Sequence, residues 1–513
     1  MKNYSCVYSA QADIEGVKLI KIETDISNGL HAFNVIGLTD KAVDESRDRV
    51  GAAIKNSGLT SPKTQNQKVT ISLAPADIKK EGPVFDLGIA LSYLLASKQI
   101  EFNPTGVVFL GELSLSGEVQ KVKGILPIAL AMKKNSIRTL YVPIENIAEA
   151  SLVDGIDVYG IHSLSELVSH IDILKKDEDR KILSASPQTE LKKEDEKNVI
   201  DFGEIKGQES AKRALLIAGS GGHNIALYGP PGTGKTMLAR AFRGILPELS
   251  LTETFEVASI HSIAGILRDQ ITSTPPFRSP HHTSSPVAVV GGGSTPKPGE
   301  ITLAHRGVLF MDEFPEFDKR VLESLREPLE EGYISIARAK GRALFPADFI
   351  LVAALNPCPC GNKGNPNKRC ICSAHDIDRY TRKLSGPIMD RIDMWVEVSN
   401  IPYDELHSVP LCNNESELYR TKIIKARDGQ RKRNSAINNK TLNSSLTTKD
   451  IDNVITLSDD IKKTLQVSAE KLALSPRSYY KIIKLARTIA DIEGSEDVGL
   501  AHVLEALQYR PRI

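Results

Sequence analysis

The chain has 513 residues, a length that predicts roughly two to four domains with ample apolar material for hydrophobic cores. Its formal net charge is only +1, which excludes nucleic-acid binding through overall positive charge and leaves that role to local basic patches. No apolar run approaches the roughly 18 residues that span a bilayer, and the first residues lack the basic-then-apolar pattern of a secretory signal. We therefore expect a cytoplasmic protein with no membrane partner, whose six cysteines are reduced or metal-bound rather than paired in disulfides.

Residues 1–170 alternate short β-rich runs with helical runs, a pattern typical of βα units. We interpret this part as a first domain that mixes strands and helices. The expected strands are Val69–Ala74, Val107–Leu113 and Thr139–Pro143, and the expected helices are Asp40–Ser57, Asp86–Ala96 and Leu126–Lys134.

Three further segments follow the first domain. Residues 171–200 are dense in charge of both signs and poor in apolar residues, a composition typical of a linker. Residues 201–400 combine strand and helix signals and are predicted to form a second α/β domain. Residues 401–513 are predicted to be all-helical, because their apolar residues recur at helical spacing. An example of one such helix face is Ile482, Leu485, Ala486 and Ile489.

A glycine-rich turn lies between an apolar strand and a helix in Asn224–Ala241. It fits the pattern G-x-x-x-x-G-K-[ST], in which glycines turn backbone N–H groups towards phosphates and the helix N-terminus adds positive potential. We expect Lys235 to neutralise the β- and γ-phosphates of ATP and Thr236 to ligate Mg²⁺. The alternative is a glycine turn with no ligand, against which the flanking strand and helix argue. The predicted nucleotide contacts are Gly229, Pro230, Pro231, Gly232, Thr233, Gly234, Lys235 and Thr236.

Two acidic residues end the apolar strand within Gly307–Phe314, at the edge where ligands bind in open α/β sheets. Asp312 is expected to hold Mg²⁺, and Glu313 to act as the general base for the attacking water. The alternative is that this pair caps the following helix, predicted at Lys319–Leu329. A third apolar strand ends at Asn356, whose amide would orient the water or sense the γ-phosphate. A turn-forming asparagine before proline is the alternative there.

Four of the six cysteines form two C-x-C pairs separated by nine residues, namely Cys358, Cys360, Cys370 and Cys372. Four thiolates from two tight turns can surround one tetrahedral Zn²⁺. Disulfides conflict with the expected cytoplasmic location, whereas a thiol redox role stays open. We predict a structural zinc site.

Together these motifs resemble the YifB/ComM group of magnesium-chelatase-like AAA+ proteins, over nearly the whole chain. The resemblance implies an N-terminal Lon-protease-like α+β domain, a central AAA+ P-loop α/β domain with a parallel sheet, and a C-terminal all-α lid domain. Besides the phosphate loop, the stretches that carry it are Gly207–Leu215, Pro276–Ser285, Gly291–Phe314, Leu355–Gly361 and Ser385–Val398.

The same resemblance implies an activity. It indicates an ATP-dependent, homo-hexameric DNA translocase or helicase that promotes branch migration during homologous recombination of transforming DNA, with ATP and Mg²⁺ as cofactors. Single-stranded or branched DNA and other recombination proteins are the implied partners. Two alternatives are a metal-insertion motor like the I subunit of magnesium chelatase, which has no Lon-like domain ahead of its ATPase, and a MoxR-type protein-remodelling chaperone, which would lack DNA-stimulated ATPase activity.

Three residues gain roles only through the resemblance. Arg391, in the stretch MDRID, matches the arginine finger that reaches a neighbouring subunit's γ-phosphate, where a guanidinium suits the charge of a transferring phosphoryl group. Arg477, at a helix start, matches the second sensor arginine, and Gln208 lies where the family's chain passes the adenine. Taken alone, each arginine would be an ordinary surface or salt-bridged residue. A finger supplied by a neighbour also requires an oligomer.

The stretch Gly332–Phe349 reads as a β-hairpin with basic residues near its tip. Its place in the chain matches a pore-facing hairpin of related ring helicases, where lysine and arginine grip phosphates without reading bases. The alternative is a solvated turn. The candidate DNA contacts are Arg338, Lys340 and Arg342.

Two adjacent histidines, His281 and His282, lie in a second stretch that the family shares. Side chains at positions i and i+1 diverge on a helix, so we do not expect a metal site. The resemblance makes this stretch an insert that lines the pore of the ring.

Residues 30–150 resemble the Lon protease domain, mainly through Lys80–Leu91 and Leu110–Ile137. Lon uses a dyad in which a lysine activates a serine nucleophile. Here the serine position carries Val84 and the lysine position carries Leu126. We therefore predict no proteolysis and expect a scaffold role in ring assembly and DNA binding.

Overall fold

The computed structural model forms two compact units. One comprises Met1–Lys193 with Ala258–Thr272, and the other Glu194–Val257 with Ser273–Ile513. Within the part of the chain that the structure describes, no helix is both long and apolar enough to cross a membrane. The described residues are 3–13, 16–176, 180–191, 200–267, 271–293, 297–338, 341–363, 368–401, 414–435 and 442–511.

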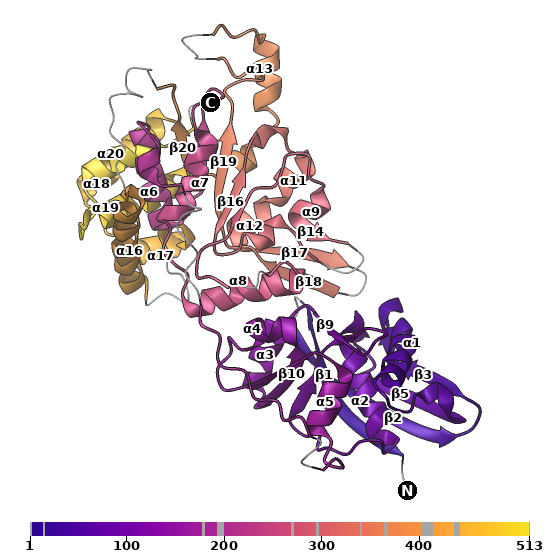
Figure 1. The fold of residues 1–513 in the computed structure, drawn as a ribbon. Coiled ribbons are helices and arrows are strands. Elements are labelled where there is room, and N and C mark those ends of the chain that lie inside the picture. The colour runs from indigo at the N-terminus through magenta and orange to yellow at the C-terminus, as the bar shows by residue number, and fades with distance from the viewer. Residues whose placement is uncertain are drawn as a thin grey trace. The chain divides into compact units, whose positions relative to one another are not determined.

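A seven-stranded mixed sheet organises the first unit, in the order β11-β10-β7-β1-β2-β5-β3 (Figure 1). The pairs β1–β2 and β2–β5 are antiparallel and the other neighbours are parallel. The strands are β1 (Tyr4–Asp13), β2 (Gly16–Asn28), β3 (Ala32–Ile36), β5 (Gln67–Ala74), β7 (Val107–Phe109), β10 (Thr139–Pro143) and β11 (Asp157–Ile161), with the short β4 (Leu38–Thr39), β6 (Lys79–Lys80), β8 (Glu112–Leu113) and β9 (Val119–Gln120) beside them. The helices are α1 (Lys41–Asn56), α2 (Asp86–Ala96), α3 (Ile125–Lys134), α4 (Ile147–Ala150) and α5 (Leu164–Ile171).

The predicted α+β class of this unit is confirmed, and α2 and β10 have the expected bounds. Two expectations are wrong. The chain does not begin with repeated βα units, because β1 and β2 form one long antiparallel hairpin. The expected strand Val107–Leu113 ends at Phe109, since Leu110 N still donates to Tyr141 O of β10 but Gly111 N turns away to donate to Val84 O.

The two positions that correspond to the catalytic serine and lysine of Lon carry buried apolar side chains. Val84 lies just before α2 and Leu126 lies in the first turn of α3. Neither side chain offers a nucleophile or a base.

The expected linker 171–200 begins at the last residue of α5, and its described residues 180–191 contain no helix or strand. Its backbone is nevertheless held by the first unit, because Ser186 N donates to Val158 O and Thr189 N donates to Ser151 O. Backbone pairing rather than side-chain burial therefore orders this polar segment.

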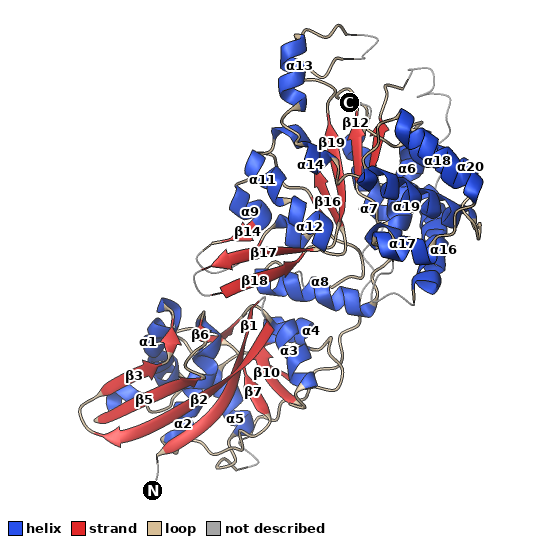
Figure 2. Cartoon of the chain, turned by 180° about the vertical axis from the view of Figure 1, so that it is seen from behind, coloured by secondary structure: helices blue, strands red, loops and turns tan. Residues whose placement is uncertain are grey.

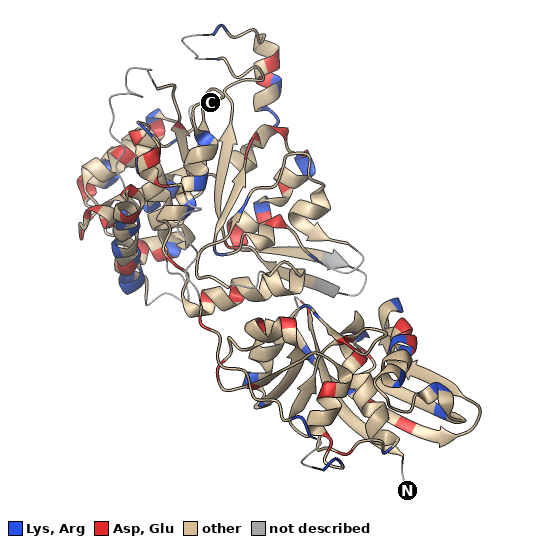
Figure 3. Cartoon of the chain, viewed as in Figure 1, with Lys and Arg blue, Asp and Glu red and all other residues tan. Residues whose placement is uncertain are grey.

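A five-stranded parallel sheet organises the second unit, in the order β13-β16-β19-β12-β20. Its three central strands carry no charged residue, as their uniform tan colour shows in Figure 3. Such continuous apolar runs are expected of parallel strands that are covered on both faces. The strands are β12 (Ile225–Tyr228), β13 (Phe277–Arg278), β16 (Val308–Met311), β19 (Ile350–Leu355) and β20 (Met394–Glu397), and β14 (Gly291–Gly292) pairs separately with β15 (Lys297–Pro298).

Helices cover this sheet on both sides (Figure 2). The helical lid, α16 to α20, gathers beside α6 and α7, whereas α9, α11 and α12 lie on the other side of the sheet. The lid confirms the predicted all-α class of the C-terminal part. The lid helices are α16 (Glu415–Asn434), α17 (Thr448–Val454), α18 (Asp459–Lys471), α19 (Pro476–Glu493) and α20 (Leu500–Gln508). The others are α6 (Glu209–Gly221), α7 (Lys235–Ile245), α8 (Leu251–Ala264), α9 (Pro286–Val290), α10 (Glu300–Leu303), α11 (Lys319–Ser324), α12 (Arg326–Glu331), α13 (Ala374–Thr381) and α14 (Gly386–Met389).

The predicted hairpin is present as the antiparallel strands β17 (Tyr333–Arg338) and β18 (Gly341–Pro346). Its last described pair is Arg338 with Gly341. Lys340 lies outside the described residues, and the structure describes only the backbone of Arg338 and Arg342.

Asp393 joins the start of the sheet to the lid. Its carboxylate accepts a hydrogen bond from Asn224 N (3.0 Å) and lies 3.2 Å from Lys481 Nζ of α19 and 3.7 Å from His223 Nδ1. Although burial raises the pKa of Asp393, Lys481 and His223 bring that pKa below its usual range. The carboxylate therefore stays ionised and fixes α19 beside the start of β12 and β20.

Candidate functional site

The phosphate loop connects the end of β12 to the start of α7, as the motif predicts. Gly232 and Gly234 have φ angles of 82° and 90°, in the left-handed region that favours glycine. Gly229 is fixed by a close approach, because a Cβ there would lie 2.1 Å from Val398 O at the end of β20. These backbone requirements explain why glycine occupies these three positions.

Lys235 lies inside the loop and is largely buried. Its Nζ donates to Gly229 O (2.7 Å), Pro230 O (2.8 Å) and Asn356 Oδ1 (3.3 Å). Burial lowers the pKa of Lys235 to about 8, and only Asp312 offsets this effect. The ammonium is thus held by neutral oxygens, which are weaker partners than the phosphate oxygens that the motif is built to bind.

Thr236 and Asp312 come together although 76 positions separate them in the sequence. Thr236 Oγ1 donates to Asp312 Oδ2 at 2.9 Å, and Asp312 Oδ1 accepts from Glu313 N at 2.9 Å. A hydroxyl and a carboxylate side by side fit the hard oxygen ligands that Mg²⁺ prefers. The pair expected to hold Mg²⁺ is therefore assembled at one place.

Glu313 does not cap a helix, so the capping alternative is wrong for this residue. Asp318 caps α11 instead, accepting a hydrogen bond from Arg320 N. Glu313 has a φ of 50°, an uncommon conformation for a residue other than glycine. Its Oε2 lies 3.2 Å from Nδ1 of His282. The ring centroids of His282 and His281 are 4.3 Å apart, with the two ring planes tilted by 32°.

The contact with His282 was missed by the sequence reasoning, which placed the two histidines in a pore-lining insert. The β13 strand that precedes them is short, and its parallel pairing with β16 sets Arg278 opposite Leu309, so that His282 and Glu313 each follow that pair by four residues. Only the alternation of apolar strands along the chain hinted at this proximity.

Asn356 and Gln208 approach the phosphate loop from either side. Asn356 follows β19, which pairs with β12 so that Leu355 lies opposite Tyr228. The Nε2 of Gln208 donates to Ser399 O (2.7 Å) and Thr233 O (3.3 Å). Asn356 and Gln208 therefore both contact the phosphate loop, although neither contact shows which nucleobase would bind.

The two predicted arginines converge on one carboxylate. Arg391 Nη2 lies 2.6 Å from Glu330 Oε2, and Arg477 Nη1 lies 2.5 Å from Glu330 Oε1. Arg391 also donates to Arg326 O (3.2 Å) and Pro387 O (2.6 Å). Burial raises the pKa of Glu330, but the two guanidinium groups outweigh it and bring the pKa below its usual range.

This arginine cluster and the phosphate loop lie at opposite ends of the parallel strands. Asn224, whose side chain donates to Arg391 O at 3.5 Å, precedes β12, whereas Gly229 follows it. Five residues of extended chain span about 16 Å. Arg477 shares the Glu330 carboxylate with Arg391, so it lies at the same end of the strands as Arg391.

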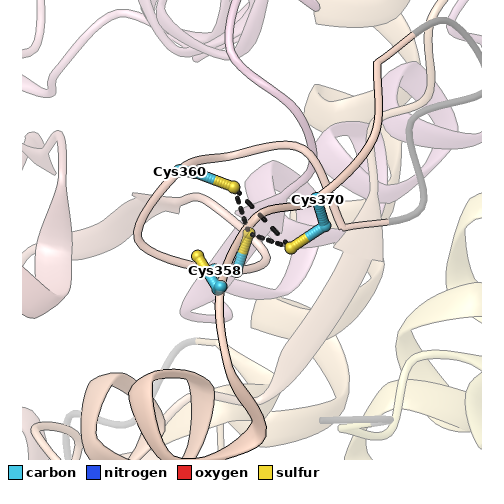
Figure 4. A group of neighbouring side chains, drawn as sticks. Cys358, Cys360 and Cys370 are labelled. Carbon is cyan, nitrogen blue, oxygen red and sulfur yellow. Dashed lines mark hydrogen bonds between the residues drawn. The ribbon is translucent and has the colours of Figure 1, made fainter.

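The four cysteines are gathered as predicted (Figure 4). The Sγ–Sγ distances are 3.5 Å for Cys358–Cys360 and 3.7 Å for both Cys358–Cys370 and Cys360–Cys370, and all four sulfurs, including that of Cys372, lie within 4.8 Å of one another. Four sulfurs bound to Zn²⁺ at about 2.3 Å lie about 3.8 Å apart. The donor set therefore fits a tetrahedral metal site.

The cysteine loop also leans on the phosphate loop. A Cβ at Gly361 would lie 2.7 Å from Cδ of Pro231, so glycine is needed for the two loops to meet. The backbone amides of Asn362 and Ile371 lower the pKa of Cys360 to about 6. The backbone amide of Cys360 lowers the pKa of Cys372, but burial and the sulfurs of Cys360 and Cys358 outweigh it and raise that pKa to about 12. The four sulfurs therefore do not all ionise easily without a cation between them.

Comparisons with known proteins agree along the whole chain. Three family profiles match: subunit ChlI of Mg-chelatase over residues 22–146, magnesium chelatase subunit ChlI over 201–406, and its C-terminal part over 413–510. Competence protein ComM of Haemophilus influenzae is 40% identical over 99% of this chain and 97% of its own length. The chain belongs to the YifB/ComM family of magnesium-chelatase-like proteins.

Other relatives define the extent of this similarity. YifB of Escherichia coli is 39% identical over 96% of this chain and 94% of its own length. The magnesium-chelatase 38 kDa subunit of Rhodobacter capsulatus is 31% identical over only 31% of this chain and 51% of its own length. The YifB/ComM family, related to AAA+ proteins of the magnesium-chelatase type, implies ATPase chemistry with ATP and Mg²⁺.

Nucleotide affinity in this YifB/ComM protein should fall as pH rises through about 8, the pKa of Lys235 in the nucleotide-free site. Above that pH the amine is neutral and binding must also take up a proton. Calorimetric titration with a non-hydrolysable ATP analogue should give a Kd about tenfold higher at pH 9 than at pH 7. A Lys235→Arg variant, which stays charged, should lose this dependence; a flat profile for the wild type would contradict the assignment.

Proposed function

We propose that this chain is an ATP-dependent DNA translocase that works as a homo-hexamer and promotes branch migration when transforming DNA recombines. The observation that carries the proposal is the assembled hydrolysis site, Thr236 and Asp312 beside Lys235 and Glu313, in a chain similar over its full length to a competence protein. The first part supports ATP hydrolysis, and the second supports a role with DNA during competence.

The groups that would carry out hydrolysis lie at the ends of three strands, β12, β16 and β19. Lys235 exchanges its loop carbonyls for phosphate oxygens, and Thr236 and Asp312 hold Mg²⁺, which neutralises phosphate charge. Glu313 accepts a proton from the attacking water. Asn356 orients that water from the end of β19, the strand that lies between β12 and β16 in the sheet. Release of Glu313 from His282 frees its carboxylate for this role.

The arginine cluster supports an oligomer. Arg391 and Arg477 lie about 16 Å of strand away from the loop of their own chain and are tied to Glu330 there. They can stabilise a transferring phosphoryl group only if another subunit's phosphate loop meets this edge. A head-to-tail contact of this kind closes into a ring, which fits the proposed hexamer.

DNA would contact the β17–β18 hairpin. Its candidate contacts are Arg338, Lys340 and Arg342. Three basic residues within five positions of the sequence, in a chain of net charge +1, would supply a local basic patch that suits sequence-independent gripping of phosphates.

A structural Zn²⁺ would occupy the four-cysteine site. Cys358 follows Asn356 by two residues, and Gly361 lies against Pro231. A metal there would fix the loop that carries the water-orienting amide and brace the phosphate loop. Its role is positional, because four thiolates leave no open coordination position.

The alternatives receive less support. The Rhodobacter capsulatus chelatase subunit aligns over only 31% of this chain, whereas ComM aligns over 99% of it. A MoxR-type chaperone, the other alternative, would hydrolyse ATP without stimulation by DNA. Both remain outcomes of the experiment below.

ATPase activity should rise at least about tenfold when forked or four-way DNA is added to the wild type, because DNA contact is proposed to complete the active ring. The rate is measured by phosphate release, with Lys235→Ala as the blank. Glu313→Gln should retain ATP binding and lose a factor of about 10² or more in kcat. Equal rates with and without every DNA tested would favour a chaperone or chelatase role.

Purified protein should contain about one Zn²⁺ per chain by mass spectrometry of metals. Cys370→Ser should lose the metal, whereas Cys6→Ser should keep it, because Cys6 lies on β1 in the other unit. Absence of zinc in protein whose four clustered thiols are intact and reduced would refute the site.

A further inference from the structure

One carboxylate on α12 holds both arginines that the proposed hydrolysis needs. Each oxygen of Glu330 takes one guanidinium, at 2.6 Å for Arg391 and 2.5 Å for Arg477. Arg391 is only 9% exposed in this position, so it is withdrawn from the surface where a neighbouring subunit would need it.

The helix that carries Glu330 is joined directly to the β17–β18 hairpin. A single residue, Gly332 with a φ of 72°, separates α12 from Tyr333 at the start of β17. Ser335 N of β17 also donates to Glu327 Oε2 of α12 at 3.0 Å. A displacement of the hairpin therefore moves α12, and with it the carboxylate of Glu330.

Two guanidinium groups can lie together only if an anion separates them, because like charges repel strongly near a protein surface. Glu330 supplies that anion within the chain. The γ-phosphate of a neighbour's nucleotide carries more negative charge and more acceptor oxygens, so it can take over the same pair of arginines. Glu330 is then an internal substitute for that phosphate.

We propose that Glu330 is a positioning residue that withholds Arg391 and Arg477 from a neighbour's nucleotide until DNA displaces the β17–β18 hairpin. The proposal rests on the function proposed above and adds its control: DNA stimulates hydrolysis by moving a carboxylate, not by touching the nucleotide. The covalent chemistry is unchanged, since Glu330 acts only through the two arginines.

The experiment compares Glu330→Gln with Glu331→Gln, a matched change at an exposed carboxylate next along the same helix. Both variants are assayed at equal ring concentration with and without four-way DNA. Because part-exposed ion pairs are weak, we expect Glu330→Gln to raise the DNA-free kcat about three- to tenfold and to lower the ratio of DNA-stimulated to basal rate by the same factor. Glu331→Gln should match the wild type. The Kd of the ring for a non-hydrolysable ATP analogue should fall in Glu330→Gln, because the released arginines reach the neighbour's γ-phosphate, and should not change in Glu331→Gln.

Glu330→Asp keeps the charge on a shorter side chain and should show a basal rate between those of the wild type and Glu330→Gln. A purely structural role predicts otherwise: lower rates with and without DNA at an unchanged ratio, which would overturn the proposal. If DNA fails to stimulate the wild type, the proposed DNA function fails. Restraint of the arginines by Glu330 would still be supported by a higher basal rate in Glu330→Gln than in Glu331→Gln, and refuted by equal rates.

Discussion

The contact between Thr236 and Asp312 is the constraint on which the rest of the site depends. It joins the helix after β12 to the end of β16, and in the sheet β19 lies between those two strands. Asn356, at the end of β19, is thereby placed next to Lys235. The parallel pairing of three apolar strands thus brings a hydroxyl, a carboxylate, an amide and an amine to one edge, although their positions in the sequence extend over more than a hundred residues.

The same sheet has a second functional edge. At its far end, Asp393 holds α19 of the lid through Lys481, and the arginine cluster lies beside it. The carboxylate of Asp393 is buried with its partners, so the lid is fixed to the sheet where the arginines are and not where the phosphates bind. Under the proposed function, each chain would carry part of a hydrolysis site at either end of these strands, as a head-to-tail ring requires.

The sequence predicted the fold class and most of the site because its signals are local. A strand, a glycine turn and a helix within Asn224–Ala241 imply a phosphate loop without any distant contact. Two C-x-C turns likewise predict a cluster of four sulfurs. Bounds were accurate for α2, an apolar run whose residues are nearly all buried. They were inaccurate where a hydrogen bond to a distant residue decides, as at Gly111, whose N–H leaves the expected strand to donate to Val84 O.

Contacts between segments far apart in the sequence were beyond prediction. Nothing near His282 signals that its ring meets Glu313, since this depends on the pairing of β13 with β16. Glu330 lies just beyond the predicted helix Lys319–Leu329, and the structure divides this segment into two helices, α11 and α12. The break orients α12 separately, and only the folded chain shows that its carboxylate meets both arginines.

The most direct test of a site divided between subunits is to mix two inactive proteins. Lys235→Ala keeps both arginines but has a phosphate loop that no longer works. The double variant Arg391→Ala/Arg477→Ala keeps a working loop but lacks both arginines. An equal mixture should recover about a quarter of the wild-type ATPase rate, because random assembly pairs an intact loop with intact arginines at one interface in four. A mixture as inactive as its two components, when both still form rings, would contradict the account.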